Sequence, residues 1–186
     1  MSLTKFRKIA YTTFVATLLL ALAPLLRAES VDDSREITQL LSQAKATATL
    51  VTHDAETLES YTRSRISWQT HARQLERMRG HTNELIEDVR ELSALRSQGS
   101  PWQQEAIDRI NPMLKDMADH LTATIEHLND NRSSIHFQPY QDYARGNRIF
   151  ADKTLVAIRD FVDYGEARAA ADSLEQKLTL PAASGE

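Results

Sequence analysis

Apolar residues recur along most of the chain at spacings that alternate between three and four, as in helices that bury one face. The first such segment runs from about Asp33 to Tyr61, with Ser34 as the expected N-cap. The second runs from about Ser67 to Ser97. The inward positions of the first segment are Ile37, Leu41, Ala44, Ala48, Val51, Ala55 and Leu58. Those of the second are Trp68, His71, Leu75, Met78, Thr82, Leu85, Val89 and Leu92.

A third segment has a clear helix start. Ser100 is placed to cap it, Pro101 stands where its missing N–H does no harm, and Gln103 can complete a capping box. Its inward positions are Ile107, Ile110, Leu114, Met117, Leu121, Ile125 and Leu128. Because this stripe continues past Pro112, the pattern predicts a kinked helix. The alternative is a short helix at 101–110, followed by a new helix capped by Asn111.

The fourth helix is expected to restart at Pro139, after a polar loop at 129–137. The run Arg145-Gly146-Asn147 could interrupt it. Its inward positions are Phe150, Leu155, Ile158, Phe161, Val162, Gly165, Ala169, Leu174 and Leu178. No strand-like alternation occurs anywhere in the chain. Four long helices with short connections predict an all-α fold, an antiparallel up-down-up-down four-helix bundle with coiled-coil-like packing.

The N-terminus has the order of a secretory signal peptide. Lys5, Arg7 and Lys8 form a basic start, and residues 9–26 are an almost uninterrupted apolar run. Ala28 is the small residue expected just before the cleavage site. We therefore expect a periplasmic or secreted protein.

The resulting organisation is a signal peptide at 1–28, a bundle domain at 29–180 and a disordered tail at 181–186. The alternative for the first segment is an uncleaved membrane anchor. Its apolar run of 18 residues reaches the lower limit for spanning a bilayer.

Composition narrows the possible partners. The chain has no cysteine, which excludes disulfides, cysteine-ligated centres and a lipid anchor on cysteine. The signal segment holds four of the 22 basic residues and no acidic one, so cleavage leaves 18 bases against 26 acids, a net charge of −8. A chain this acidic has no electrostatic attraction for nucleic acid or an anionic membrane. We expect neither as a partner, and no stable membrane insertion after cleavage.

The sequence contains no motif typical of catalysis or cofactor binding. Di-metal bundles place a glutamate three residues before a histidine on two helices, and no histidine here has a glutamate at that distance. The chain also lacks a glycine-rich phosphate loop, an H-E-x-x-H motif and a G-x-S-x-G motif. We therefore expect no enzymatic activity and no cofactor.

One group of histidines is nevertheless a candidate site. In an antiparallel bundle, one end would gather His71, His127, His136, Tyr140 and Tyr143. His53 would lie one to two turns deeper. Neutral imidazoles bind Zn²⁺ or Cu²⁺, and they gain charge in mild acid. Because no ligand spacing within a helix supports a site, we assign no metal; His71, His127 and His53 are the candidates if one exists.

The charged residues are otherwise expected on outer faces. No acidic residue falls on an apolar stripe, and the charged residues at 84–91, Asp88 among them, would form the solvated face of the second helix. Asp116 and His120, four residues apart, are expected to make a surface pair. Gly165 is expected to leave room for a large neighbouring side chain.

Three segments resemble a known group of proteins. They are residues 100–104 (Ser-Pro-Trp-Gln-Gln), 106–112 (Ala-Ile-Asp-Arg-Ile-Asn-Pro) and 160–165 (Asp-Phe-Val-Asp-Tyr-Gly). The likeness, over roughly residues 35–178, is to uncharacterised exported bacterial proteins that are helical over most of their length. That group has no assigned activity, ligand or catalytic residues. The resemblance therefore implies export and a helical fold, and it transfers no site.

These features predict an exported, non-enzymatic helical bundle with a structural role or a protein partner in the cell envelope. Two alternatives stay open. One is a carrier that binds a metal or small ligand at the histidine-rich end. The other is a membrane-tethered sensor or adaptor that keeps residues 9–26.

Overall fold

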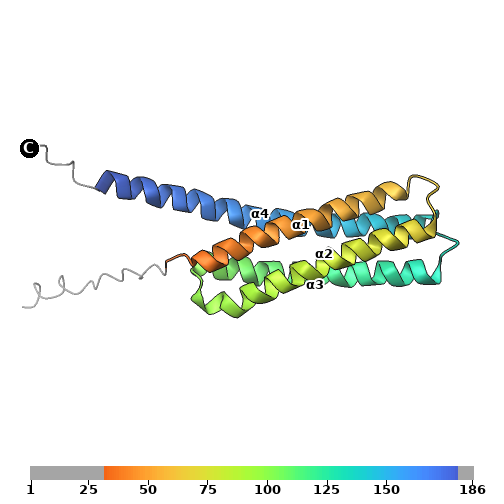
Figure 1. Cartoon of the computed structure of the whole chain (residues 1–186), viewed down its shortest axis with the longest axis horizontal. Coiled ribbons are helices and arrows are strands. Elements are labelled where there is room, and N and C mark those ends of the chain that lie inside the picture. The colour runs from red at the N-terminus through yellow and green to blue at the C-terminus, as the bar shows by residue number, and fades with distance from the viewer. Residues whose placement is uncertain (1–31, 180–186) are drawn as a thin grey trace, which may run out of the picture. The chain divides into compact units, whose positions relative to one another are not determined.

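The computed structural model describes residues 32–179, and every regular element within them is a helix. The predicted signal peptide at 1–28 and the predicted tail at 181–186 lie outside the described residues. The helices are α1 (Arg35–Tyr61), α2 (Trp68–Leu95), the 3₁₀ turn η1 (Arg96–Gln98), α3 (Pro101–Asp130) and α4 (Gln138–Thr179). The protein is therefore all-α in this range, with four long helices packed together (Figure 1).

The starts of α1 and α3 form as their sequences predict. Ser34 caps α1 by accepting a hydrogen bond from the backbone N–H of Ile37, and Ser100 and Gln103 form the capping box of α3. Gln103 Oε1 also accepts from the backbone N–H of Ser34 at 2.9 Å, while its Nε2 donates to the Ser34 carbonyl at 2.9 Å. One buried glutamine thus satisfies the start of its own helix and ties it to the start of α1.

The two possible interruptions do not occur. α3 runs through Pro112, so the alternative of a break before it is wrong. Packing explains this, because Ile110 and Leu114 on either side are both buried. α4 likewise runs through Gly146. Next to it, the side chain of buried Asn147 donates to Thr124 Oγ1 on α3 at 2.6 Å, which fixes this turn of α4 to its neighbour.

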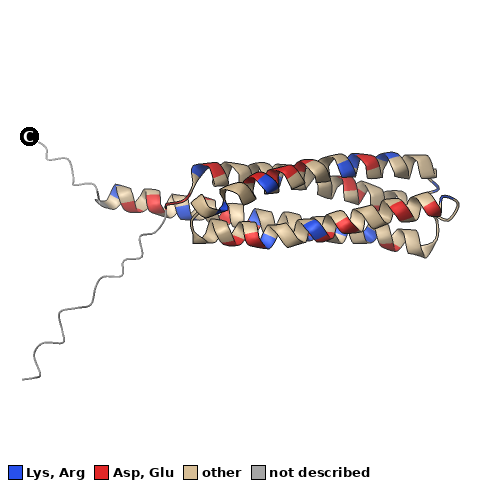
Figure 2. Cartoon of the chain, turned by 90° about the horizontal axis from the view of Figure 1, so that it is seen from below, with Lys and Arg blue, Asp and Glu red and all other residues tan. Residues whose placement is uncertain are grey.

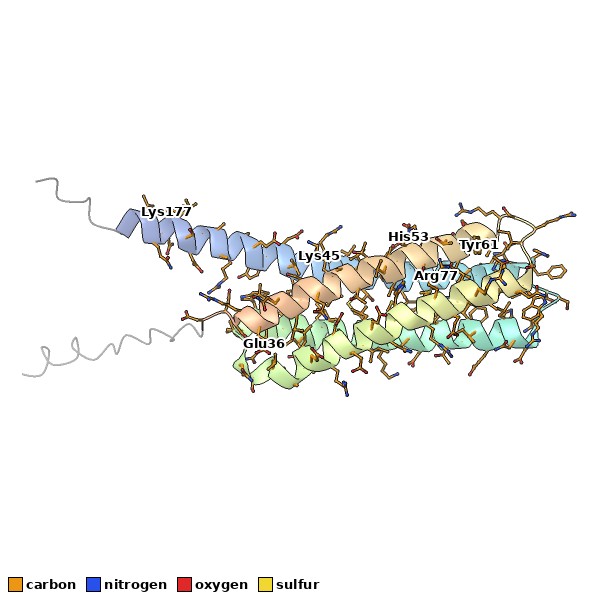
Figure 3. All side chains as sticks on the ribbon, viewed as in Figure 1. Glu36, Lys45, His53, Tyr61, Arg77 and Lys177 are labelled. Atoms are coloured by element: carbon orange, nitrogen blue, oxygen red, sulfur yellow. The ribbon has the colours of Figure 1, made fainter. Side chains whose placement is uncertain are left out.

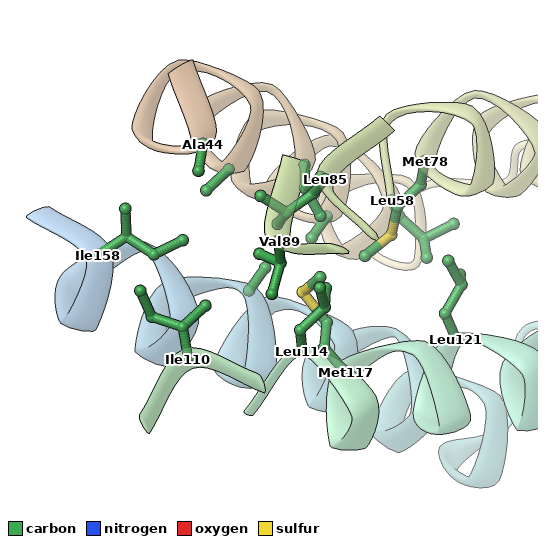
Figure 4. Close-up of a cluster of buried hydrophobic side chains, with 14 of the residues drawn as sticks. Ala44, Leu58, Met78, Leu85, Val89, Ile110, Leu114, Met117, Leu121 and Ile158 are labelled. Carbon is green, nitrogen blue, oxygen red and sulfur yellow. The ribbon is translucent and has the colours of Figure 1, made fainter. Parts of the chain in front are cut away.

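The core is built from the predicted stripes. α1 packs against α2 and α4, and α3 packs against the same two helices. All seven inward positions predicted for α1 are buried. Figure 4 shows the interior where the helices meet, with Ala44 from α1, Leu85 from α2, Met117 from α3 and Ile158 from α4.

The last turns of α4 differ from the prediction. Ala169, Leu174 and Leu178 were expected in the core, yet all three are exposed, Leu174 by 60% and Leu178 by 85%. α4 continues past the ends of the other three helices (Figures 1 and 2). Arg168 still reaches Asp33, just before α1, at 3.4 Å; beyond that level none of the other described helices covers the stripe. We call residues 166–178 the α4 extension.

The outer surface of the helices carries mixed charge. Lysine, arginine, aspartate and glutamate alternate along the outer faces (Figure 2). Within residues 32–179, no helix combines the length and the apolar character needed to cross a membrane.

Candidate functional site

His71 lies at the end of the protein where the α1–α2 and α3–α4 connections meet. Its side chain is fully buried, and a 3.0 Å hydrogen bond joins Nδ1 to the Tyr140 hydroxyl. The rings of Tyr61 and Tyr140 meet the imidazole edge-on, with centroids 5.7 and 5.2 Å away. Burial, and secondarily the nearby His136, lowers the pKa of His71 to about 4. This imidazole is therefore neutral at physiological pH.

His127 shares Tyr140 with His71. The His127 ring stacks on Tyr140 at 6.3 Å and lies 4.6 Å from the Tyr143 ring. The sequence thus placed these four residues together correctly. His53 does not join them, because it is exposed on α1 (Figure 3).

His71, His127, Tyr140 and Tyr143 contact one another mainly through the faces and edges of their rings. Their nitrogen and oxygen atoms do not converge as the ligands of a metal would. Among residues 32–179, no group of three or more histidine, cysteine, aspartate or glutamate side chains is placed to hold a metal ion. Nε2 of His71 is buried and has no hydrogen-bond partner among the described protein atoms. The observed arrangement therefore packs side chains from all four helices through their rings, and it leaves Nε2 of His71 without a protein partner.

The expected surface pair of Asp116 and His120 does not form. His120 Nε2 instead makes a 3.0 Å hydrogen bond to the Tyr143 carbonyl on α4, and its ring packs on Phe150 at 5.0 Å. Gly146 makes this possible, because a Cβ atom at that position would collide with the His120 ring. The sequence signal was the glycine itself, which was considered only as a possible interruption of the helix.

Two acidic residues of the described range 32–179 are buried, contrary to the expectation that all lie outside. The first, Asp54, is 2% exposed. Its Oδ1 accepts from Gln74 Nε2 at 3.0 Å, and its Oδ2 lies 2.6 Å from Nδ1 of His81. Since Gln74 and His81 both belong to α2, the carboxylate of Asp54 crosslinks α1 to α2.

The second buried acid is Asp88, which the sequence analysis placed on the solvated face of α2. It is 6% exposed, and it accepts hydrogen bonds from Gln43 Nε2 at 2.6 Å and Thr47 Oγ1 at 2.8 Å, both on α1. Asp54 and Asp88 each stand three residues after a core position, Val51 and Leu85. They lie at the edge of the buried face, which is wider than the stripe that periodicity marks.

A groove with a volume of about 640 Å³ runs between the first half of α3 and the middle of α4. We call it the α3–α4 groove. Its aromatic and apolar lining consists of Trp102, Met113, Val156, Ala157, Phe161 and Tyr164. Its charged lining consists of Glu105, Arg109, Asp152, Lys153 and Asp160. Val156 and Tyr164 are 42% and 49% exposed, so the groove offers apolar surface to a partner.

Trp102 closes one end of this groove and is held from three sides. Its indole N–H donates to Asp33 Oδ1 at 2.7 Å, and its ring meets that of Tyr164 edge-on at 5.4 Å. The ring also lies against the backbone of Gly165, where an added Cβ atom would come within 2.8 Å of it. The predicted use of Gly165 is confirmed. A rigid aromatic wall of this kind is typical of sites that bind apolar side chains.

Comparison with known proteins finds no matching family model, no matching curated protein and no matching solved structure. The likeness to exported helical proteins therefore stays a prediction. No known protein therefore indicates the function of this chain.

Proposed function

We propose that this protein is an exported helical bundle that binds a protein partner outside the cytoplasm and catalyses no reaction. The architecture we infer is an antiparallel up-down-up-down four-helix bundle with coiled-coil-like packing. It is supported by the short connections at 62–67 and 131–137 and by the pairing of each helix with two neighbours. The three-four spacing of core positions supports knobs-into-holes packing.

The α3–α4 groove is the observation that carries the proposal. Its half-exposed apolar lining is flanked by side chains of both signs, which is the surface that an amphipathic helix requires. The apolar face of such a helix would pack on Val156, Phe161 and Tyr164. Its polar edges would meet the charged lining. We therefore infer that the partner presents an amphipathic helix.

The buried ionisable groups support a non-catalytic role. His71 bonds to Tyr140, Asp54 to Gln74 and His81, and Asp88 to Gln43 and Thr47. Each of these contacts joins one helix to another. Burial lowers the pKa of His71, so the imidazole stays neutral among the helices that it joins.

The export half of the proposal rests on residues 1–28. N-terminal sequencing of the protein recovered from its own cells is expected to begin at Glu29, in a soluble envelope fraction. A product that keeps its N-terminus and stays in the membrane fraction would favour the tethered sensor or adaptor instead.

The binding half is tested in the groove itself. A photo-crosslinking amino acid replaces Tyr164, and the same amino acid replaces Phe137 as a control, because Phe137 is 63% exposed outside the groove. We expect a defined adduct from position 164 that Val156→Glu abolishes. Equal adducts from both positions, or none from position 164, would contradict a role for the groove.

A further inference from the structure

The α4 extension carries an apolar stripe that the described part of the chain leaves uncovered. Ala167, Ala171, Leu174 and Leu178 follow spacings of four, three and four, and all are exposed. Lys177 marks the far end of this segment in Figure 3. Most of the stability of a helix in a protein comes from packing its apolar face, and these last turns of α4 have no such packing within residues 32–179. A stripe of two alanines and two leucines on a projecting helix is therefore a surface that a partner would complete.

The stripe continues the face of α4 that lines the groove. Tyr164 lies three residues before Ala167 and seven before Ala171, so all three belong to one face of the helix. The two surfaces also match in length. The stripe from Ala167 to Leu178 spans about 17 Å, and the groove from Asp152 to Tyr164 spans about 18 Å at the helical rise of 1.5 Å per residue.

We propose that the groove receives the α4 extension of a second copy of this chain, and that the exchange is reciprocal. The two α4 helices would run antiparallel about a two-fold axis near Ala167. Leu174 and Leu178 of each copy would then lie beside Phe161 and Ala157 of the other. One chain carries both halves of the contact, which is the condition for a closed symmetric dimer. This inference rests on the proposed function, since it names the amphipathic helix that the groove binds.

The charges along both surfaces permit this pairing. The extension carries Glu166, Arg168, Asp172, Glu175 and Lys177. The groove is also lined by charges of both signs. Neither surface has the single-sign excess that would hold two copies apart.

The test measures the molar mass of the chain from residue 29 onward by light scattering across a dilution series. We expect a dimer, and we expect Leu174→Glu with Leu178→Glu to raise the dissociation constant at least roughly tenfold. Val156→Glu in the groove should do the same. Leu50→Glu, at a leucine of α1 that is 47% exposed, is the matched control and should leave the mass unchanged. Circular dichroism checks that each variant stays helical.

Mixing the two variants separates this arrangement from its competitors. The extension variant keeps an intact groove and the groove variant keeps an intact extension, so an equimolar mixture should form a heterodimer through one restored contact. If Val156→Glu stays as dimeric as the unaltered chain, the extensions pair with each other and the proposed docking is wrong. A monomer at every concentration also overturns it. In that case an adduct from position 164 with another protein would still support the proposed function.

Discussion

Acid should destabilise this protein through one buried histidine. His71 is fully buried against Tyr61 and Tyr140, and its pKa falls from 6.5 to about 4. Because the folded-state pKa is lowered, the unfolded chain binds a proton between these two values while the folded chain does not. The stabilisation is therefore complete above pH 6.5 and is lost as the pH falls toward 4.

The size of the effect follows from the same two pKa values. Each unit of pKa difference corresponds to about 1.4 kcal/mol. Going from about pH 7 to about pH 4.5 should remove about 2 kcal/mol of unfolding free energy through His71 alone. That is a large fraction of the total stability of an ordinary domain, about 5–15 kcal/mol.

The assay compares urea unfolding of the unaltered chain with that of a double variant, His71→Phe with Tyr140→Phe. Replacing both partners avoids leaving the Tyr140 hydroxyl buried without a bond. Carboxylates titrate in both proteins, so their contribution cancels in the difference between the two acid-induced losses. We expect the unaltered chain to lose about 2 kcal/mol more than the variant. Equal losses would refute the assignment of a buried, neutral imidazole at this position.

Three further predictions concern two glycines, the buried Asp54 and the binding of Zn²⁺. Gly80→Ala should stabilise the protein by about 1 kcal/mol, because nothing lies near the new Cβ atom. Gly146→Ala should destabilise it by about 1–2 kcal/mol, because the new Cβ atom would collide with His120. If thermal unfolding shows that both substitutions raise the stability, the packing described at Gly146 is wrong. Asp54→Ala should cost about 1–3 kcal/mol by leaving Gln74 and His81 short of an acceptor. Its control, Asp119→Ala, removes only an exposed pair with Lys115 and should stay within about 0.5 kcal/mol. Added Zn²⁺ should leave the melting temperature unchanged, and a rise that His71→Phe abolishes would restore the carrier hypothesis.

Helix positions and the main core could be predicted from the sequence because they depend on local spacing. Every inward position predicted for α1 is buried, and Ser34 and Ser100 stand at the helix starts as expected. The ends of the stripes and their edges could not be predicted in the same way. Asp88 was taken as solvated because it lies off the apolar stripe of its helix, yet Gln43 and Thr47 on α1 give it two hydrogen-bond donors. Such contacts depend on how two helices are rotated against each other, which one helix's periodicity leaves undetermined.

The candidate sites show the same difference between what can be predicted from the sequence and what depends on how the helices pack. The sequence brought His71, His127, Tyr140 and Tyr143 together, because connection lengths alone decide which helix ends meet. It did not find the α3–α4 groove, because a groove is defined by what neighbouring helices leave uncovered. The sequence identifies Trp102 and Tyr164 as aromatic residues, but it does not predict how far either side chain is exposed.

The α4 extension shows why a correct pattern can lead to a wrong placement. Leu174 and Leu178 follow the spacing of core residues, so they were assigned to the core of their own chain, yet both are exposed. Periodicity establishes that one face of a helix is apolar, and it is silent about which molecule covers that face. α4 continues where its neighbours have ended (Figure 1), and the middle of the same helix lines a groove of similar length that residues 32–179 leave open. A stripe that residues 32–179 do not bury is thus matched by a groove that the same residues do not fill, and this correspondence is the physical basis for expecting two copies to complete each other.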